Sequence, residues 1–135
     1  MDAVRIATDP DPFAPFRIAQ GYRVGDLVFL SGQAALDAAG RVVGVGDFDA
    51  QAEQTRENLA QVLGAAGCGF DQVVKVTIFL TDMGHFPKVL ALRARWFRPP
   101  WPADTIVEVA RLALPGLLLE VEAIAVVGGR RVDPR

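Results

Sequence analysis

The final strand of the chain, predicted over residues 117–127, is the feature that most restricts how this sequence can fold. Successive side chains of a strand point to opposite faces of the sheet. One face is an apolar row of Leu117, Leu119, Val121, Ala123 and Ala125. The other face alternates aliphatic side chains with two carboxylates, in the order Leu118, Glu120, Glu122, Ile124 and Val126. The second face is too apolar for solvent, so we expect helices to cover the first face and another subunit the second.

The size and composition of the chain fit one domain. Its 135 residues, 51% hydrophobic and 22% charged, are enough for a single core. We expect one domain over 1–135, with a proline-rich loop at 9–16 and a flexible tail at 128–135. The net charge of −2 argues against nucleic acid or an anionic membrane as a partner. The single cysteine, and the lack of an apolar signal segment or membrane span, predict a cytoplasmic protein.

Local signals place the other elements. Gly25-Asp26 is a hairpin turn, Asp47 or Asp49 caps the first helix, and Gly67 ends it. The predicted elements are strands at 16–24 and 27–31, a helix ending near 67, a strand at 73–82, a helix from about 84 to 97, and strands at 105–112 and 117–127. The inner face of the second helix is predicted to carry Phe86, Val89, Leu90, Arg93 and Phe97. This order predicts an α+β fold with two helices on one face of a mixed sheet.

Classical catalytic and metal-binding motifs are missing from the sequence. The single histidine, His85, is interpreted as structural, and no cluster of metal-ligating residues occurs, so no metal is expected. Lys75 could form a Schiff base only if burial lowered its pKa, and a structural role is favoured. Glu120 and Glu122 are more informative, because a carboxylate on a covered apolar face has a raised pKa and suits general acid or base catalysis. An ion pair with an arginine across an interface is an equally good interpretation.

Several short segments occur in one characteristic order along the chain. They are Leu30-Ser31-Gly32-Gln33, the pair Gln51 and Asn58, segments 63–67 and 73–77, Thr81-Asp82, Pro102-Ala103, and segments 107–112 and 120–125. As a set they resemble the Rid (YjgF-type, reactive-intermediate deaminase) family. The resemblance implies a chorismate-mutase-like fold and a homotrimer with a central barrel and small-molecule pockets between subunits. It also implies hydrolysis of imines and enamines to 2-oxo acids and ammonia, without a cofactor.

The resemblance also assigns individual residues. The glutamate that helps to activate the attacking water corresponds to Glu120, and the backbone lining the pocket corresponds to Ser31-Gly32 and Thr105-Ile106. In active members of the family, an arginine after the Pro-Ala pair binds the substrate carboxylate, but Asp104 stands here. The family's pocket tyrosine, a helix asparagine and a nearby aromatic residue align with Ile18, Leu90 and Arg93.

Asp104 changes the sign of the charge at the position that holds the substrate. Two like charges about 4 Å apart, at an effective dielectric constant near 20, repel by roughly 4 kcal/mol. A simple 2-imino acid is therefore expected to bind poorly unless Arg17 or Arg93 holds its carboxylate. Alternatively, Asp104 pairs with one of these arginines and the site is structural.

Two functions remain open at this point. One is a hydrolase of an imine, an enamine or a related C–N compound, with Glu120 as the base and a substrate anchored differently from a 2-imino acid. The other is a non-catalytic trimer that binds or senses a metabolite in the same cleft. RNA cleavage, which some family names mention, is disfavoured by the acidic charge, the lone histidine and the lack of an aromatic stacking row.

Overall fold

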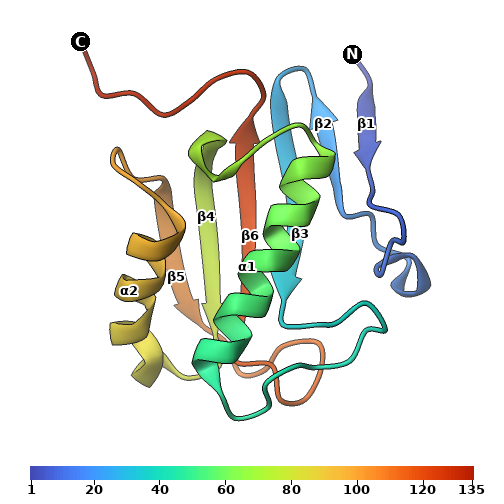
Figure 1. Cartoon of the computed structure of the whole chain (residues 1–135), viewed down its shortest axis with the longest axis vertical. Helices are drawn as coiled ribbons and strands as arrows, with labels where there is room; N and C mark the ends of the chain where they lie inside the picture. The colour runs from blue at the N-terminus through green and yellow to red at the C-terminus, as the bar shows by residue number, and fades with distance from the viewer.

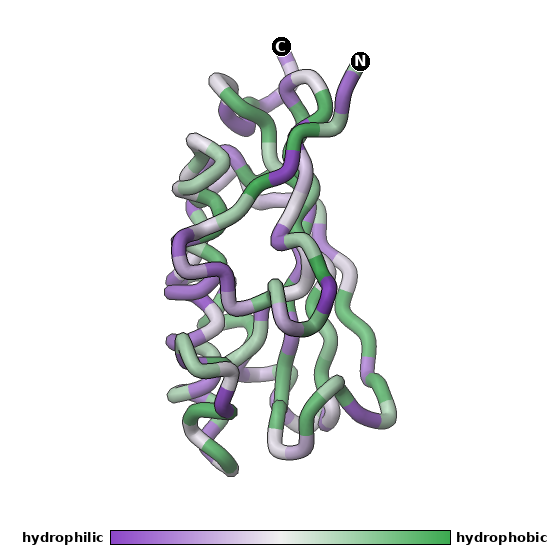
Figure 2. The backbone as a smooth tube through the Cα atoms, turned by 90° about the vertical axis from the view of Figure 1, so that its right-hand side faces the viewer, coloured by the Kyte–Doolittle hydropathy of each residue, from purple (hydrophilic) through white to green (hydrophobic).

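The computed structural model describes residues 1–135 as one helical layer packed on one sheet (Figure 1). The elements are β1 (Ala3–Ile6), β2 (Gly21–Val24), β3 (Leu27–Ala34), α1 (Phe48–Ala65), β4 (Val73–Leu80), α2 (Phe86–Trp96), β5 (Ala103–Glu108) and β6 (Leu119–Val126). The sheet has six strands in the order β1-β2-β3-β6-β4-β5, and only the β4–β5 pair is parallel. Turned by 90°, the molecule shows helices on one side and strands on the other (Figure 2). The predicted α+β fold is confirmed.

The ends of α1 follow the local signals in the sequence. The Asp47 carboxylate accepts a hydrogen bond of 3.1 Å from the Ala50 N–H, so Asp47 is the helix cap and Asp49 lies in the first turn. Gly67 has φ +76°, the left-handed conformation that glycine adopts without strain. Neither α1 nor α2 is long and apolar enough to cross a membrane.

The core lies between the helices and one face of the sheet. Four residues of the predicted apolar row, all in β6, are buried in this core, which confirms that this face meets the helices: Leu119, Val121, Ala123 and Ala125. The fifth, Leu117, precedes β6 and packs in a separate cluster with Ala34 and Ala35. Helix α1 contributes Leu59, Val62 and Leu63, which are at most 2% exposed. The prediction for the inner face of α2 was partly wrong, because Phe86 and Leu90 are 38% and 56% exposed. The stripe that packs on the sheet is Val89, Leu92 and Trp96, followed by Phe97.

The boundaries of the strands differ from the prediction, most of all for β2 and β5. Residues 16–20 are not part of the strand, because a 3-10 turn, η1 (Ala14–Phe16), ends at Arg17 in a left-handed conformation with φ 60°. Pairing in β2 begins at Gly21, whose backbone approaches that of Phe29 too closely for a Cβ atom. The strand β1 was not predicted at all. Strand β5 begins two residues earlier than predicted and ends at Glu108, so residues 109–118 form a loop.

The second face of the sheet has no covering layer within the chain. Tyr22, Leu27 and Phe29 lie there with exposed fractions of 42–44%, beside the mixed row of β6. Such an apolar surface matches the face that the sequence predicted to be covered by another subunit.

Candidate functional site

A cavity of about 440 Å³ lies where β3 and β6 meet the loops at 13–18 and 113–117. Eight of its 11 lining residues are hydrophobic, among them Phe16, Ile18, Leu36, Leu114 and Leu117. The polar atoms at its base come from Ser31, Gly32 and Glu120. The structure thus brings together three residues that the sequence analysis singled out.

The position of Glu120 depends on a close contact with Gly32. The register of β3 against β6 shifts between Leu30 and Gln33, so Ser31 and Gly32 form an irregular, bulged segment. A Cβ atom on Gly32 would lie 2.6 Å from Oε2 of Glu120, which is too close for any side chain. Glycine is needed here because it allows the carboxylate to pack against the β3 backbone.

Burial raises the pKa of Glu120, and the nearby charge of Glu122 raises the same pKa further. None of the five ion pairs of the chain involves Glu120. An unpaired carboxylate whose pKa is raised is a stronger base than an ordinary glutamate, and it is suited to accept a proton from a water molecule or to orient one. An ion pair with an arginine of another subunit remains a prediction.

Ser31 has a structural contact that accounts for its hydroxyl. Its Oγ donates a hydrogen bond of 2.6 Å to the Ala19 carbonyl, and its N–H donates one of 2.9 Å to the Gln20 carbonyl. These bonds hold the segment before β2 against the base of the cavity. Ser31 therefore offers backbone and shape to a ligand, and its hydroxyl is not set up as a nucleophile.

Asp104 and Arg93 form a two-pronged ion pair at a second cavity. Nε and Nη2 of Arg93 donate to the two carboxylate oxygens of Asp104 at 2.9 and 2.8 Å. Asp104 is exposed as a residue because β5 is an edge strand, but its side chain is only 19% exposed, and that of Arg93 is 25% exposed. This cavity, of about 490 Å³, is also lined by Leu90 and Trp101. The charge of Asp104 is thus compensated, and the Nε–Nη2 edge of the Arg93 guanidinium is occupied, while Nη1 has no hydrogen-bond partner within the chain.

Arg17 is a neighbour in sequence of the other cavity's lining but is not itself a lining residue. It lies between Phe16 and Ile18, which both line the Glu120 cavity. Its side chain is exposed and forms no ion pair. Of the two arginines that the sequence suggested as replacements for the family's arginine, only Arg17 carries a free charge.

The two cavities lie on opposite faces of the sheet. Glu120 points away from the helices, because its neighbours Leu119 and Val121 are buried beneath them. Asp104 points to the helical side, where it meets α2, and Ile106 packs on the core from that side. A single chain therefore does not bring Glu120 and the Arg93–Asp104 pair together.

The other sequence candidates have structural contacts. Nζ of Lys75 donates to Oγ1 of Thr105 at 2.6 Å on the uncovered face of the sheet. The His85 ring stacks on Phe48 with centroids 4.6 Å apart. Sequence reasoning missed the apolar wall that the loop at 113–117 contributes, and the unusual run of leucines around Pro115 and Gly116 was the signal that could have indicated it.

Comparisons with known proteins place the chain among small relatives of matching length. The model of the family described as Endoribonuclease L-PSP matches residues 7–127. Protein DfrA of Myxococcus xanthus is 44% identical over 118 residues, covering 87% of this chain and 88% of that protein. The 2-iminobutanoate/2-iminopropanoate deaminase of mouse is 38% identical over 124 residues, covering 91% and 90%. The crystal structure of RidA from an Antarctic Psychrobacter is 34% identical with a TM-score of 0.83, covering 91% of this chain and 98% of that one.

Proposed function

The chain belongs to the Rid (YjgF/RutC) family, the one described as Endoribonuclease L-PSP, and from this premise we propose that it hydrolyses a small imine, enamine or related C–N compound. The observation that supports this proposal best is Glu120, an unpaired carboxylate with a raised pKa in an apolar cavity of about 440 Å³. The relatives named as 2-iminobutanoate/2-iminopropanoate deaminases, from mouse and human, support the reaction class.

The proposed chemistry needs one base and one water molecule. The Glu120 carboxylate removes a proton from water while the oxygen adds to the carbon of the C=N bond, and the nitrogen takes up a proton. The tetrahedral product then releases ammonia and leaves a carbonyl compound, so that imine plus water gives ketone or aldehyde plus ammonia. A raised pKa helps, because it makes the carboxylate a stronger base towards water than an ordinary glutamate.

The complete site is proposed to lie between subunits of a homotrimer in the cytoplasm. Glu120 of one copy would face the cavity of Arg93 and Asp104 in the next copy, since the two lie on opposite faces of one chain. The exposed apolar side chains of Tyr22, Leu27 and Phe29 support burial of this face against another copy.

The Arg93–Asp104 pair argues for a substrate other than a simple 2-imino acid. Its guanidinium already binds a carboxylate through Nε and Nη2 at 2.8–2.9 Å, and the charges of the pair cancel. A substrate carboxylate would have to displace Asp104 to obtain the same two bonds. We propose a neutral or cationic substrate, or one whose carboxylate is held by Arg17, the exposed residue between Phe16 and Ile18 of the Glu120 cavity.

The test is ammonia release from a panel of imines and enamines generated in the assay, including 2-iminopropanoate and neutral and cationic analogues. Glu120→Gln is expected to lower kcat/KM by roughly 10²- to 10⁴-fold on whichever substrate reacts. Glu122→Gln is the matched control, because Glu122 is an exposed carboxylate on the same face of β6. It should retain most of the rate, since burial, and not the charge of Glu122, is the larger cause of the raised pKa of Glu120. No acceleration with any compound, or equal rates for wild type and Glu120→Gln, would refute the hydrolase.

A second variant tests the role given to Asp104. The double substitution Arg93→Phe and Asp104→Arg replaces the ion pair by the arginine and aromatic side chain that the family has at these positions. We expect this variant to gain activity towards 2-iminopropanoate relative to wild type. If it gains none while remaining folded, the ion pair does not determine substrate choice.

The same ion pair favours one alternative function. Because no cation is free at the family's arginine position, the cleft could hold a metabolite without turning it over. This binding protein would show an increased melting temperature with its ligand and no product. Detection of product above the uncatalysed rate rules it out.

A further inference from the structure

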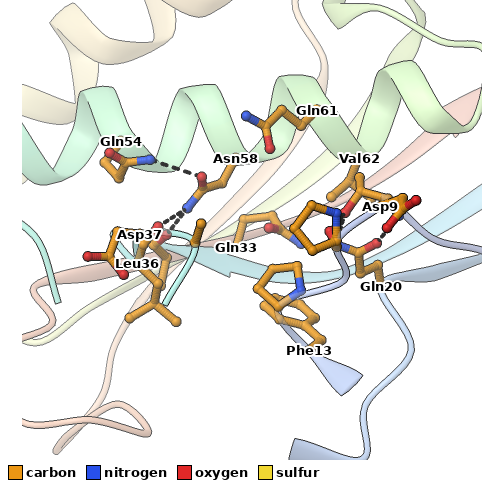
Figure 3. Close-up of a pocket in the computed structure, with 15 residues that line it drawn as sticks. Asp9, Phe13, Gln20, Gln33, Leu36, Asp37, Gln54, Asn58, Gln61 and Val62 are labelled. Carbon is orange, nitrogen blue, oxygen red and sulfur yellow. Dashed lines mark hydrogen bonds between the residues drawn. The ribbon is translucent and has the colours of Figure 1, made fainter. Parts of the chain in front are cut away.

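A third cavity, of about 550 Å³, lies beside the Glu120 cavity (Figure 3). It is bounded by the loop at 8–13, by the end of β3 with residues 36–38, and by one face of α1. Phe13, Ala34 and Leu36 line both cavities, so they form a common wall between them. The third cavity lies within one chain and does not contain Glu120.

The lining of this cavity is unusually rich in side-chain amides. Five carboxamides and two carboxylates face it: Gln20, Gln33, Gln54, Asn58, Gln61, Asp9 and Asp37. No lysine, arginine or histidine contributes to the lining, so its formal charge is −2. The groups that face an occupant are therefore hydrogen-bonding groups with an excess of negative charge.

Two of these amides hold the walls in place. Gln20, which is 2% exposed, accepts from the Thr8 N–H at 2.6 Å and donates to the Thr8 hydroxyl at 3.0 Å. Asn58 donates to the carbonyls of Ala34 and Leu36, both at 2.8 Å. These bonds fix the N-terminal loop and the segment after β3 to the rest of the fold, so the cavity is preformed.

Other acceptors of the lining have no donor. Gln33 is 3% exposed, and its Nε2 donates to the Ser31 carbonyl at 3.2 Å, but its Oε1 accepts no hydrogen bond. Figure 3 shows the Gln33 side chain between those of Asn58 and Gln20. Oε1 of Gln54 is also free, as is one carboxylate oxygen of Asp37, whose other oxygen accepts from two backbone N–H groups. These oxygens border the cavity and have no donor within the chain, so a ligand with N–H groups would give each of them a hydrogen bond.

We propose that this cavity binds a small organic cation that carries several N–H donors, such as a diamine or a guanidinium compound. The two carboxylates supply attraction, and the free amide oxygens of Gln33 and Gln54 select for donors. A metal ion does not fit, because the chain has no group of three or more His, Cys, Asp or Glu side chains arranged to hold one. The site shares the wall residues Phe13, Ala34 and Leu36 with the Glu120 cavity, but none of its polar groups takes part in the proposed hydrolysis.

Isothermal titration calorimetry on the full chain tests this site. The probes are 1,4-diaminobutane and agmatine, with 1,4-butanediol as the uncharged match and succinate as the anionic match. We expect both cations to bind at least about tenfold tighter than the diol, and succinate not to bind. Equal affinity for diol and diamine, or no binding of either cation at millimolar concentration, would overturn the proposal.

Two variants locate the bound cation. Asp37→Asn keeps the acceptor for the N–H groups of Ala39 and Arg41 but removes the charge, and Gln33→Met removes the free oxygen at similar volume. Each should weaken binding of 1,4-diaminobutane roughly tenfold. Glu57→Gln, an exposed carboxylate of α1 outside the cavity, is the control and should bind as wild type. If Gln33→Met does not fold, the Asp37→Asn variant alone tests the site. Wild-type affinity of Asp37→Asn for 1,4-diaminobutane would show that the cation binds elsewhere.

Discussion

Neutralising the Arg93–Asp104 pair gives the most direct check of the candidate cleft. The two hydrogen bonds measure 2.8 and 2.9 Å, and the side chains are 25% and 19% exposed. Solvent-exposed pairs contribute roughly 0.2–1 kcal/mol, whereas breaking a fully buried pair costs about 3–5 kcal/mol. The partial burial and the paired geometry place this interaction between the two ranges, at about 1–2 kcal/mol of coupling energy.

The assay is a double-mutant cycle of Arg93→Met and Asp104→Asn followed by urea unfolding at pH 7. Each single variant should lose about 1–3 kcal/mol of unfolding free energy, because its partner is left without a counter-charge. The double variant should lose less than the sum of the two, by about 1–2 kcal/mol. All four proteins must be compared at one protein concentration, since association changes apparent stability.

The exposed pair of Lys88 and Asp49 is the control for this cycle. Its separation of 2.9 Å matches that of the Arg93–Asp104 pair, but its side chains are 48% and 75% exposed. Its coupling energy should stay below about 0.5 kcal/mol. A coupling of Arg93 with Asp104 no larger than this would show that the guanidinium is not held by Asp104, and the argument that Arg93 is occupied would fail.

Two further predictions concern buried polar groups. Because burial raises the pKa of Glu120 in the folded state, the stability of the wild type should fall as pH rises from the ordinary glutamate value, about 4.3, through the raised value. Glu120→Gln should lack this decrease, so it should be more stable than wild type at pH 7 and equally stable at lower pH. The measurement is the free energy of unfolding in urea at several pH values, and the same pH dependence in both proteins would contradict the prediction. Gln51, which is 0% exposed, donates to the carbonyls of Gly116 at 2.8 Å and Gly44 at 3.2 Å and accepts from the Leu118 N–H. Gln51→Met should therefore cost about 2–4 kcal/mol of unfolding free energy, and a urea-measured loss below about 0.5 kcal/mol would mean that these groups find other partners.

The parts of the fold that the sequence predicted well are those with local causes. The alternation in β6, the Gly25-Asp26 turn and the Asp47 cap each depend on residues close in the chain. The inner face of α2 was misplaced because its stripe depends on where the sheet lies, and an eleven-residue helix contains few positions to define it. Strand β1 was missed because its four residues pair with β2 across the proline-rich loop, which is a nonlocal contact.

The candidate site was predicted in part, for similar reasons. The resemblance to the Rid family singled out Ser31, Gly32 and Glu120, which the structure places at one cavity. The sequence left open whether Arg17 or Arg93 pairs with Asp104. Arg93 lies on a helix and Asp104 on a strand, and the spacing of two residues on different elements does not predict whether they are in contact. The anchoring of Arg131, which donates to the carbonyls of Phe70 and Arg98 from within the predicted tail, also has no local signature.

The charges of the cavity linings favour the same class of ligand in both proposals. The Glu120 cavity carries one unpaired carboxylate in its lining, and the second cavity carries an ion pair whose charges cancel. The lining of the amide-rich cavity contains two more carboxylates and no lysine, arginine or histidine. Attraction between opposite charges then favours neutral or cationic compounds at both places, unless Arg17 turns its free guanidinium into the Glu120 cavity. The Arg17→Gln variant tests this exception. If its substrate preference equals that of wild type, Arg17 does not attract carboxylate substrates. If it loses activity only on substrates that carry a carboxylate, Arg17 is the residue that binds this group.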